Sequence, residues 1–523
     1  MLANKSFTLI GSGVSVMLIA ALTGCSASGG VPGASKGGEL RLALLGDIST
    51  PDPDTAYDGS ELNIVNSAYE GLLGYVPGKQ EPELTGVLAT EWTASANNTV
   101  FTFRLREGVT FHDGTPFTAD AIQSSFDRRN AIGEGPSYMT AGVASVVAAD
   151  DFNVTITLRQ PNSSFLDLLA SPFGPKMISP TALKEHPVVN GSEDWFDSND
   201  AGTGPYTYGA FAPGTSYQLN AYGGYWGDAP GYDAVSFDVF SNSATIQLEL
   251  QDGGVDGLIG YADASTFDQL KRSDRLSAYA FPSMETPTMF VNPQSPDLAD
   301  PDVRRSFISS IDFNALADTA LADTATPTDG VFPTTLLPAN LNTQAITYNP
   351  NALAQLAKGQ LAGSTITIAY AQAGPAAQAL SDNLAAVLNG AGIAAESVGY
   401  DTGSYYAALT EGAAAPDITF YSGFPDTASP EAWAFVFYTP AGGLDLFGAD
   451  VPGVADLIDQ ATVTGDDALY GDVAQRVSES GYWRSVATSL GLAVFQKGIS
   501  GVDRAYSPVI TGILDIALIE PPA

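Results

Sequence analysis

Cys25 is the residue whose chemistry the sequence defines most clearly, because it is the only cysteine among 523 residues. It directly follows Ala21-Leu22-Thr23-Gly24, which ends an apolar run over 14–22, and a single positive charge, Lys5, precedes that run. Charge, apolar run and small residues in this order are typical of a secretory signal peptide. The pattern resembles a bacterial lipobox, in which the thiol receives a diacylglyceryl group. We therefore predict a signal peptide over 1–24 and lipidation of Cys25, with an ordinary signal peptide and a chance cysteine as the alternative.

The other candidate motifs do not predict catalysis or metal binding. The sequence has no H-E-x-x-H, no Gly-rich dinucleotide turn and no G-x-x-x-x-G-K-[ST] phosphate loop. Asp52, Asp54 and Asp58 hint at a calcium loop, but Ala56 stands at the next ligand position, so a Pro/Asp turn is the better interpretation. His112 lies in a Gly-rich turn, where we expect it to pair with the adjacent carboxylate. We predict no catalytic residue, no metal and no cofactor; a glycosidase with paired carboxylates is the alternative from another class.

The charge balance is strongly acidic, with 58 Asp and Glu against 21 Lys and Arg and a formal net charge of −37. Binding to phosphates requires basic patches, so we expect no nucleic-acid partner. The acidic residues are spread along the chain, which is typical of a solvated surface that keeps an extracellular protein soluble. The chain after Cys25 has no cysteine, so we expect neither a disulfide nor a thiol metal site there.

The organisation of the chain predicts a flexible N-terminal tether followed by a folded region. Residues 25–38 are mostly Ser, Gly, Ala and Pro, which indicates a lipidated, unstructured tether. The body that follows is long enough for two or three domains. Hydrophobic spacing predicts strands at 39–44, 99–105, 153–158, 365–370 and 417–421, and helices at 61–73, 302–317 and 376–390, with another helix capped by Thr118. Such mixing favours an α/β or α+β class.

A series of ordered sequence blocks gives the chain a family resemblance. The blocks read YEGL at 69–72, LATEW at 88–92, FTFRLREGVTFHDGTPFTAD at 101–120, GTGPY at 202–206, YW at 225–226, QDGGVD at 251–256 and, after Asn292, DVRRSF at 302–307. This series resembles family 5 of the extracellular solute-binding proteins of ABC importers. Members of that family take up oligopeptides, dipeptides and, in some cases, nickel chelates, opines or sugars.

The resemblance implies an α/β, two-lobed fold of the periplasmic-binding-protein type, type II and similar to cluster C, with an extra inserted domain. Ligand would be enclosed between the hinged lobes. Mapped onto this chain, lobe I comprises 39–70, 200–285 and 490–523, the inserted domain comprises 71–199, and lobe II comprises 286–489.

The resemblance also implies a ligand-binding carboxylate. In peptide-binding members, an acidic residue four positions before a proline meets the α-ammonium group of the ligand. Asp426 stands at that position, Trp433 matches an aromatic residue after the proline, and Asn292 of the following block is included in the site. A cation that loses water between the lobes needs a close carboxylate. A plain turn at Asp426 is the structural alternative.

Two departures from the family pattern leave the identity of the ligand open. The usual Trp three residues before the acid is Gly423 here, so Tyr421 or Phe424 would supply the ring, and the usual Asp before the proline is Ser429. A sugar oligomer, an opine or a metal chelate therefore stays an alternative ligand.

The function implied is that of a lipid-anchored, extracytoplasmic binding protein, in the periplasm or at the cell surface. It would capture di- or oligopeptides as a monomer and deliver them to ABC permease and ATPase subunits. A lipoprotein that senses its ligand without transport is a further alternative.

Overall fold

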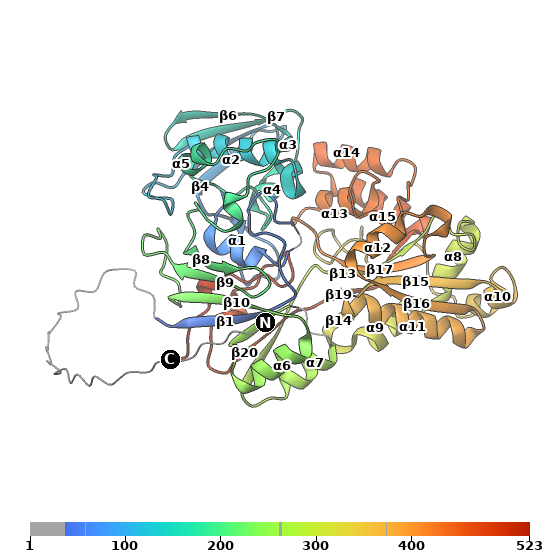
Figure 1. Cartoon of the computed structure of the whole chain (residues 1–523). Coiled ribbons are helices and arrows are strands. Elements are labelled where there is room, and N and C mark those ends of the chain that lie inside the picture. Colours follow the sequence, from blue (N-terminus) through green and yellow to red (C-terminus); the bar gives the residue numbers. More distant parts are fainter. Residues whose placement is uncertain (1–36, 58, 261–263, 373) are drawn as a thin grey trace, which may run out of the picture.

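The computed structural model describes residues 37–57, 59–260, 264–372 and 374–523 (Figure 1). The predicted signal peptide, Cys25 and nearly all of the predicted tether lie outside the described residues. Within the described part of the chain, no helix is long and apolar enough to cross a membrane. Figure 1 shows two bodies side by side, one drawn from blue to green and one from yellow to orange.

The first body contains a seven-stranded sheet whose strands come from distant parts of the chain. Its strands, in spatial order, are β12 (Leu276–Phe281), β20 (Gly491–Gln496), β11 (Gly257–Ile259), β1 (Glu39–Leu45), β10 (Ala234–Phe240), β9 (Ser216–Ala221) and β8 (Tyr206–Ala212). β1 is parallel to both of its neighbours. Leu40 and Leu42 of β1 are fully buried, which agrees with the strand predicted there.

A four-stranded antiparallel sheet stands above the first sheet in Figure 1. Its strands are β4 (Ala89–Ala94), β5 (Val100–Leu105), β7 (Asn153–Leu158) and β6 (Val143–Asp150). The alternation predicted for β5 is confirmed, because Phe101, Phe103 and Leu105 are buried and the residues between them are exposed. Gly108 and Gly114 of the following turns have φ values of 80° and 83°, which favour glycine.

The second body is built on a five-stranded sheet. Its strands are β16 (Ala394–Tyr400), β15 (Thr365–Ala371), β17 (Ile418–Gly423), β13 (Thr286–Val291) and β18 (Trp483–Ser485). The long helix α11 (Pro375–Ala391) contacts β15, β16 and β17, and its Leu380, Leu384 and Leu388 belong to the same core as Ile366 and Ile368. The two-lobed fold is therefore present, while the residue boundaries of its domains stay a prediction.

The remaining elements are short ribbons and helices. The ribbons pair β2 (Leu73–Tyr75) with β3 (Leu84–Gly86) and β14 (Ala325–Pro327) with β19 (Ala487–Ser489). The helices are α1 (Leu62–Ala68), α2 (Asp120–Ile132), α3 (Tyr138–Ala141), α4 (Phe165–Ala170), α5 (Pro180–Glu185), α6 (Ser243–Asp252), α7 (Ala264–Lys271), α8 (Pro301–Ser310), α9 (Phe313–Leu321), α10 (Ala352–Lys358), α12 (Thr402–Leu409), α13 (Pro430–Tyr438), α14 (Val454–Thr464) and α15 (Asp467–Ser480).

Three helix predictions were wrong in their bounds. The helix predicted over 302–317 is two helices, because Ile311 is extended and Asp312 caps α9 by accepting from Ala315 N. The helix predicted over 61–73 ends at Ala68, since Tyr69 takes an extended conformation. Thr118 does not cap α2, whose N-cap is Ala119 without a side-chain bond.

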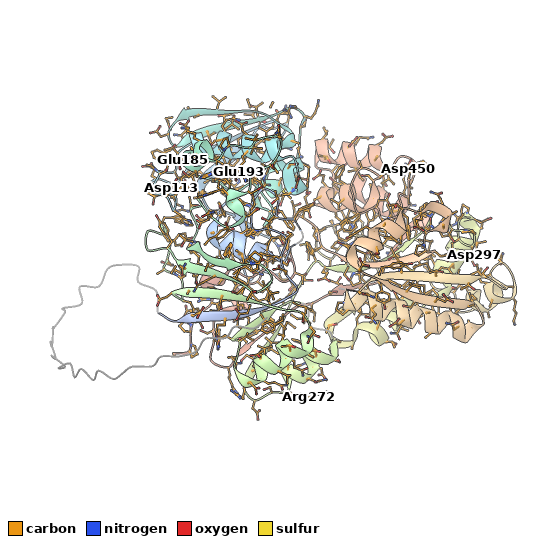
Figure 2. All side chains as sticks on the ribbon, in the orientation of Figure 1. Asp113, Glu185, Glu193, Arg272, Asp297 and Asp450 are labelled. Atoms are coloured by element: carbon orange, nitrogen blue, oxygen red, sulfur yellow. The ribbon has the colours of Figure 1, made fainter. Side chains whose placement is uncertain are left out.

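The acidic side chains are distributed over both bodies. Figure 2 shows Asp113, Glu185 and Glu193 on the part that carries β4 to β7, and Asp297 and Asp450 on the second body. The negative charge is thus not confined to one face that would mark a single cationic partner.

Candidate functional site

The two bodies meet at Asp426, which lies in the loop after β17, three residues beyond the last residue of the strand, Gly423. Its side chain is 8% exposed, and Oδ2 accepts hydrogen bonds from Tyr57 Oη and Tyr138 Oη, each at 2.5 Å. Tyr57 lies between β1 and α1, and Tyr138 begins α3. Both hydrogen bonds that described residues donate to the Asp426 carboxylate reach Oδ2, which leaves Oδ1 as the oxygen at which a ligand can bind.

The protonation of this cluster is set mainly by burial. Burial raises the pKa of Asp426 above its ordinary value, and the bonds from Tyr138 and Tyr57 act in the opposite direction. Burial and the Asp426 carboxylate both raise the pKa of Tyr57 and of Tyr138. The two phenols are therefore neutral donors, and the carboxylate is the one group of the cluster that attracts a cation.

Residues on the opposite side of the cleft hold the backbone around Asp426. Ser171 Oγ donates to the carbonyl oxygen of Asp426 at 2.5 Å, and Ala428 N donates to Tyr75 Oη at 3.0 Å. The hydroxyls of Ser164 and Ser429 lie 2.6 Å apart. Ser429 also accepts from Glu431 N and thereby caps α13, which explains how serine replaces the acid usual in the family.

A buried ion-pair network holds the loop that carries Tyr57. Arg128 Nη1 lies 2.8 Å from Asp52 Oδ1, and Arg129 Nε lies 2.8 Å from Asp54 Oδ1. All four of these side chains are at most 4% exposed. Arg129 Nη1 also donates to Phe173 O at 2.9 Å, and this bond connects the loop to the segment that follows α4. The carboxylates of Asp52 and Asp54 are thus engaged by arginines, in agreement with the turn interpretation.

Aromatic rings surround the carboxylate. Phe424 is stacked on Phe173, with ring centroids 6.4 Å apart, and Tyr421 is close enough to raise the pKa of Tyr57. A ring at 423 is excluded, since a Cβ on Gly423 would lie 2.4 Å from Phe437 Cζ. Tyr421 of β17 and Phe424 of the loop after it are therefore the aromatic residues that shortly precede Asp426 in the chain.

The structure does not bring the other two predicted residues to the same place. Trp433 is 1% exposed, donates from Nε1 to Tyr438 Oη at 2.8 Å and stacks on Phe437 at 4.0 Å, so it belongs to the core behind α13. Asn292 follows β13 at the end opposite to Gly423 and donates from Nδ2 to Gly412 O at 2.9 Å. Their positions give no support to a direct contact with ligand.

His112 has a structural partner other than the one expected. Its Nδ1 pairs with Asp200, and its Nε2 lies 3.0 Å from Gly204 O, whereas Asp113 accepts bonds from Thr115 N and Ser179 Oγ. The pairing of His112 with Asp113 was therefore a wrong prediction. In the part of the chain that the structure describes, no group of three or more His, Cys, Asp or Glu is arranged to hold a metal.

The cavity beside Phe424 is small. A cavity of about 30 Å³ is lined by Gly59, Asn63, Phe424 and Gly512, among others. That volume holds about one or two water molecules. This cavity is therefore too small to hold a peptide.

Comparison with known proteins identifies related chains. The family model described as bacterial extracellular solute-binding proteins, family 5 Middle, matches residues 83–445. The probable D,D-dipeptide-binding periplasmic protein DdpA of Escherichia coli K12 is 30% identical over 299 residues, which are 56% of this chain and 57% of that protein. The glutathione-binding protein GsiB of Shigella flexneri is 29% identical over 408 residues, 76% of each chain.

Solved structures share the fold over nearly the whole chain. The periplasmic binding protein DppA from Helicobacter pylori, in complex with the peptide STSA, superposes with a TM-score of 0.77 at 21% identity. The superposition covers 94% of this chain and 99% of that one. At this identity the likeness establishes the two-lobed fold.

Proposed function

Because the chain belongs to family 5 of the bacterial extracellular solute-binding proteins, we propose that it captures di- or oligopeptides between its lobes and delivers them to an ABC permease. The observation that carries the proposal is the buried carboxylate of Asp426, whose Oδ1 accepts neither of the two hydrogen bonds that described residues donate to it. The α-ammonium group of a peptide is the complementary cation. Relatives named for a D,D-dipeptide and for glutathione add support for a peptide-like ligand.

The energetics favour an ammonium group at this position. A hydrogen bond between two charged groups is about twice as strong as one between neutral groups, and the low polarity around Asp426 strengthens it further. Loss of one partner of such a buried pair costs about 2–5 kcal/mol. Main-chain hydrogen bonds to an extended peptide would add affinity without selecting side chains.

Closure of the lobes is the proposed signal to the permease. A ligand shifts the equilibrium toward the closed form by as much as its affinity for that form exceeds its affinity for the open form. The tyrosine bonds to Asp426 make the closed form accessible, and the ligand would add contacts that exist only there. The permease and its ATPase subunits would supply the transport step.

Lipid anchoring is a separate part of the proposal. Acylation of Cys25 and the tether over 25–38 would hold the protein at the outer face of the membrane. Cys25→Ser expressed in the native host should move the protein from the membrane pellet to the soluble fraction, as measured by fractionation and immunoblotting. Continued membrane retention of the variant would contradict the anchor.

The proposed ligand is tested by calorimetry on the purified protein. Ligands that the native protein carries are first identified by mass spectrometry, and the identified compound is then titrated into the wild type and into Asp426→Asn. We expect a free-amine peptide and a loss of affinity of about 30-fold or more in the variant, from the cost of about 2–5 kcal/mol given above. Asp450→Asn, an exposed position on the same body, is the matched control. A carried sugar, opine or chelate, or equal affinity in both proteins, would contradict the proposal.

A further inference from the structure

A second and larger cavity is present, and Asp426 is not among the residues that line it. Its volume is about 660 Å³, within the usual range for small-molecule sites. It is lined by residues of α1 and β2, by 170–172 and Lys176, by 225–229 and by the C-terminal segment 505–518, with Val87 and Pro205. None of its lining residues belongs to the second body, so the cavity is not the cleft between the lobes.

One wall of this cavity is fixed by Glu70. The Glu70 carboxylate accepts hydrogen bonds from Thr203 Oγ1 at 2.7 Å, Tyr225 Oη at 3.0 Å and Trp226 Nε1 at 2.8 Å. The carboxylate oxygens of Glu70 therefore have little remaining capacity to accept hydrogen bonds from a ligand. The two aromatic rings that it orients line the cavity together with apolar side chains such as Leu73.

Lys176 is the only cationic side chain among the lining residues. It is 7% exposed, and its ammonium group makes no hydrogen bond or ion pair to any described residue. Burial, together with the charge of Arg129, lowers the pKa of Lys176 to about 7, and the charge of Glu70 opposes this shift. A buried cation without a close partner is unfavourable to folding, so an anion that reached Lys176 would gain a strong, desolvated contact.

We propose that this cavity is a second binding site, and that its ligand is a small monoanion with an apolar body whose acidic group pairs with Lys176. The aromatic and aliphatic side chains that line the cavity would contact the apolar part of the ligand. The carboxylates of Glu70, Asp228 and Asp515 also line the cavity and repel anions, so the ligand would carry a single acidic group, placed against Lys176. Asp426 does not line this cavity, although two of the lining residues, Ser171 and Tyr75, bond to the backbone at Asp426 and Ala428.

The test uses the full-length protein and the fluorescent monoanion 1-anilinonaphthalene-8-sulfonate as a probe. We expect one saturable probe site whose signal is displaced by octanoate and not by octylamine, which has the same chain length and the opposite charge. Lys176→Met should weaken the octanoate-displaceable binding at least tenfold. The variant should fold, since methionine fills similar space and removes a buried charge.

Two further variants separate the site from general surface binding. Lys184→Met removes an exposed lysine of α5 and should leave the probe affinity unchanged. Ala229→Trp places a large side chain in the cavity without altering Lys176, and it should weaken the binding of the probe as well. Three results would each overturn the proposal. They are wild-type affinity in Lys176→Met or in Ala229→Trp, displacement by octylamine as strong as by octanoate, and the absence of saturable binding.

Discussion

At the scale of residues, the proposed site depends on the Asp426 carboxylate, which two neutral tyrosine hydroxyls already contact. Tyr57 and Tyr138 both bond to Oδ2 of Asp426, so their hydroxyls and a ligand ammonium at Oδ1 can be satisfied together. The tyrosines would then act as positioning residues that keep the carboxylate ionised and correctly oriented. Their loss should affect both the affinity and its dependence on pH.

Tyr138→Phe should weaken peptide binding about tenfold, since a hydrogen bond to a charged group contributes about 1.5–3 kcal/mol and part of it is recovered by water. The Tyr138 bond lowers the pKa of Asp426, so its removal should raise that pKa further above the ordinary value. Binding requires the ionised carboxylate and is lost as pH falls through its pKa. Calorimetry between pH 4.5 and pH 7.5 should therefore show the loss beginning at a higher pH in the variant.

The control for this experiment is Tyr348→Phe, which removes the hydroxyl of a tyrosine that is 51% exposed. Its affinity and pH profile should match those of the wild type. An unchanged profile in Tyr138→Phe would contradict the role assigned to Tyr138.

Sequence reasoning located Asp426 but not its partners. Asp426 was recognisable because its distance from Pro430 follows a family pattern. Tyr57 and Tyr138 are 369 and 288 residues away from Asp426 along the chain. No local pattern reports such contacts, because they arise only when two bodies close on each other. Trp433 and Asn292 were assigned by position in the pattern, and that pattern does not report which side of a helix or which end of a strand a residue occupies.

At the scale of elements, the loop between β1 and α1 is held by α2. Arg128 and Arg129 are adjacent in α2, and both reach the Pro/Asp turn that precedes Tyr57. The same network contacts the carbonyl of Phe173, so one pair of arginines connects three parts of the cleft wall. The turn is thus held by buried ion pairs although it contains no regular structure.

Arg129→Ala should lower the free energy of unfolding by about 3–5 kcal/mol, because it leaves the buried carboxylate of Asp54 without one of its arginines. Urea denaturation followed by circular dichroism measures the change. Arg272→Ala is the control, since its pair with Asp268 on α7 is exposed and should contribute about 0–1 kcal/mol. Equal effects of the two substitutions would show that the network does not stabilise the fold.

Strands and helices were predictable where the hydrophobic pattern was long and regular. β7 was predicted at its observed bounds, and α11 within one residue of them. The predictions failed where a single residue changes conformation, as at Ile311 and Tyr69, because apolar spacing continues through both positions. Apolar spacing reports which face is buried and is insensitive to a local break in the backbone.

At the scale of the whole molecule, the proposed function requires the two lobes to separate. The hydroxyls of Ser164 on one side and Ser429 on the other lie 2.6 Å apart, and both side chains are buried. Such a contact must break when the cleft opens. A covalent link at this point would hold the two lobes together. The chain has no cysteine after Cys25, so no native thiol there would compete for the engineered disulfide.

The double variant Ser164→Cys/Ser429→Cys should form a disulfide that locks the lobes. The oxidised protein should bind peptide at a rate far below that of the wild type, because the cleft cannot open, and reduction by dithiothreitol should restore binding. Stopped-flow fluorescence measures both rates. Each single cysteine variant is the control. Fast binding by the oxidised double variant would contradict a hinged mechanism.

The central claim is that Asp426 meets a positive charge at the end of the ligand. The direct measurement is a calorimetric cycle with one peptide in two forms, free and N-acetylated, titrated into the wild type and into Asp426→Asn. We predict that acetylation weakens binding to the wild type about 30-fold or more and has almost no effect in Asp426→Asn, since both changes remove the same interaction. Equal penalties for acetylation in the two proteins would contradict the claim.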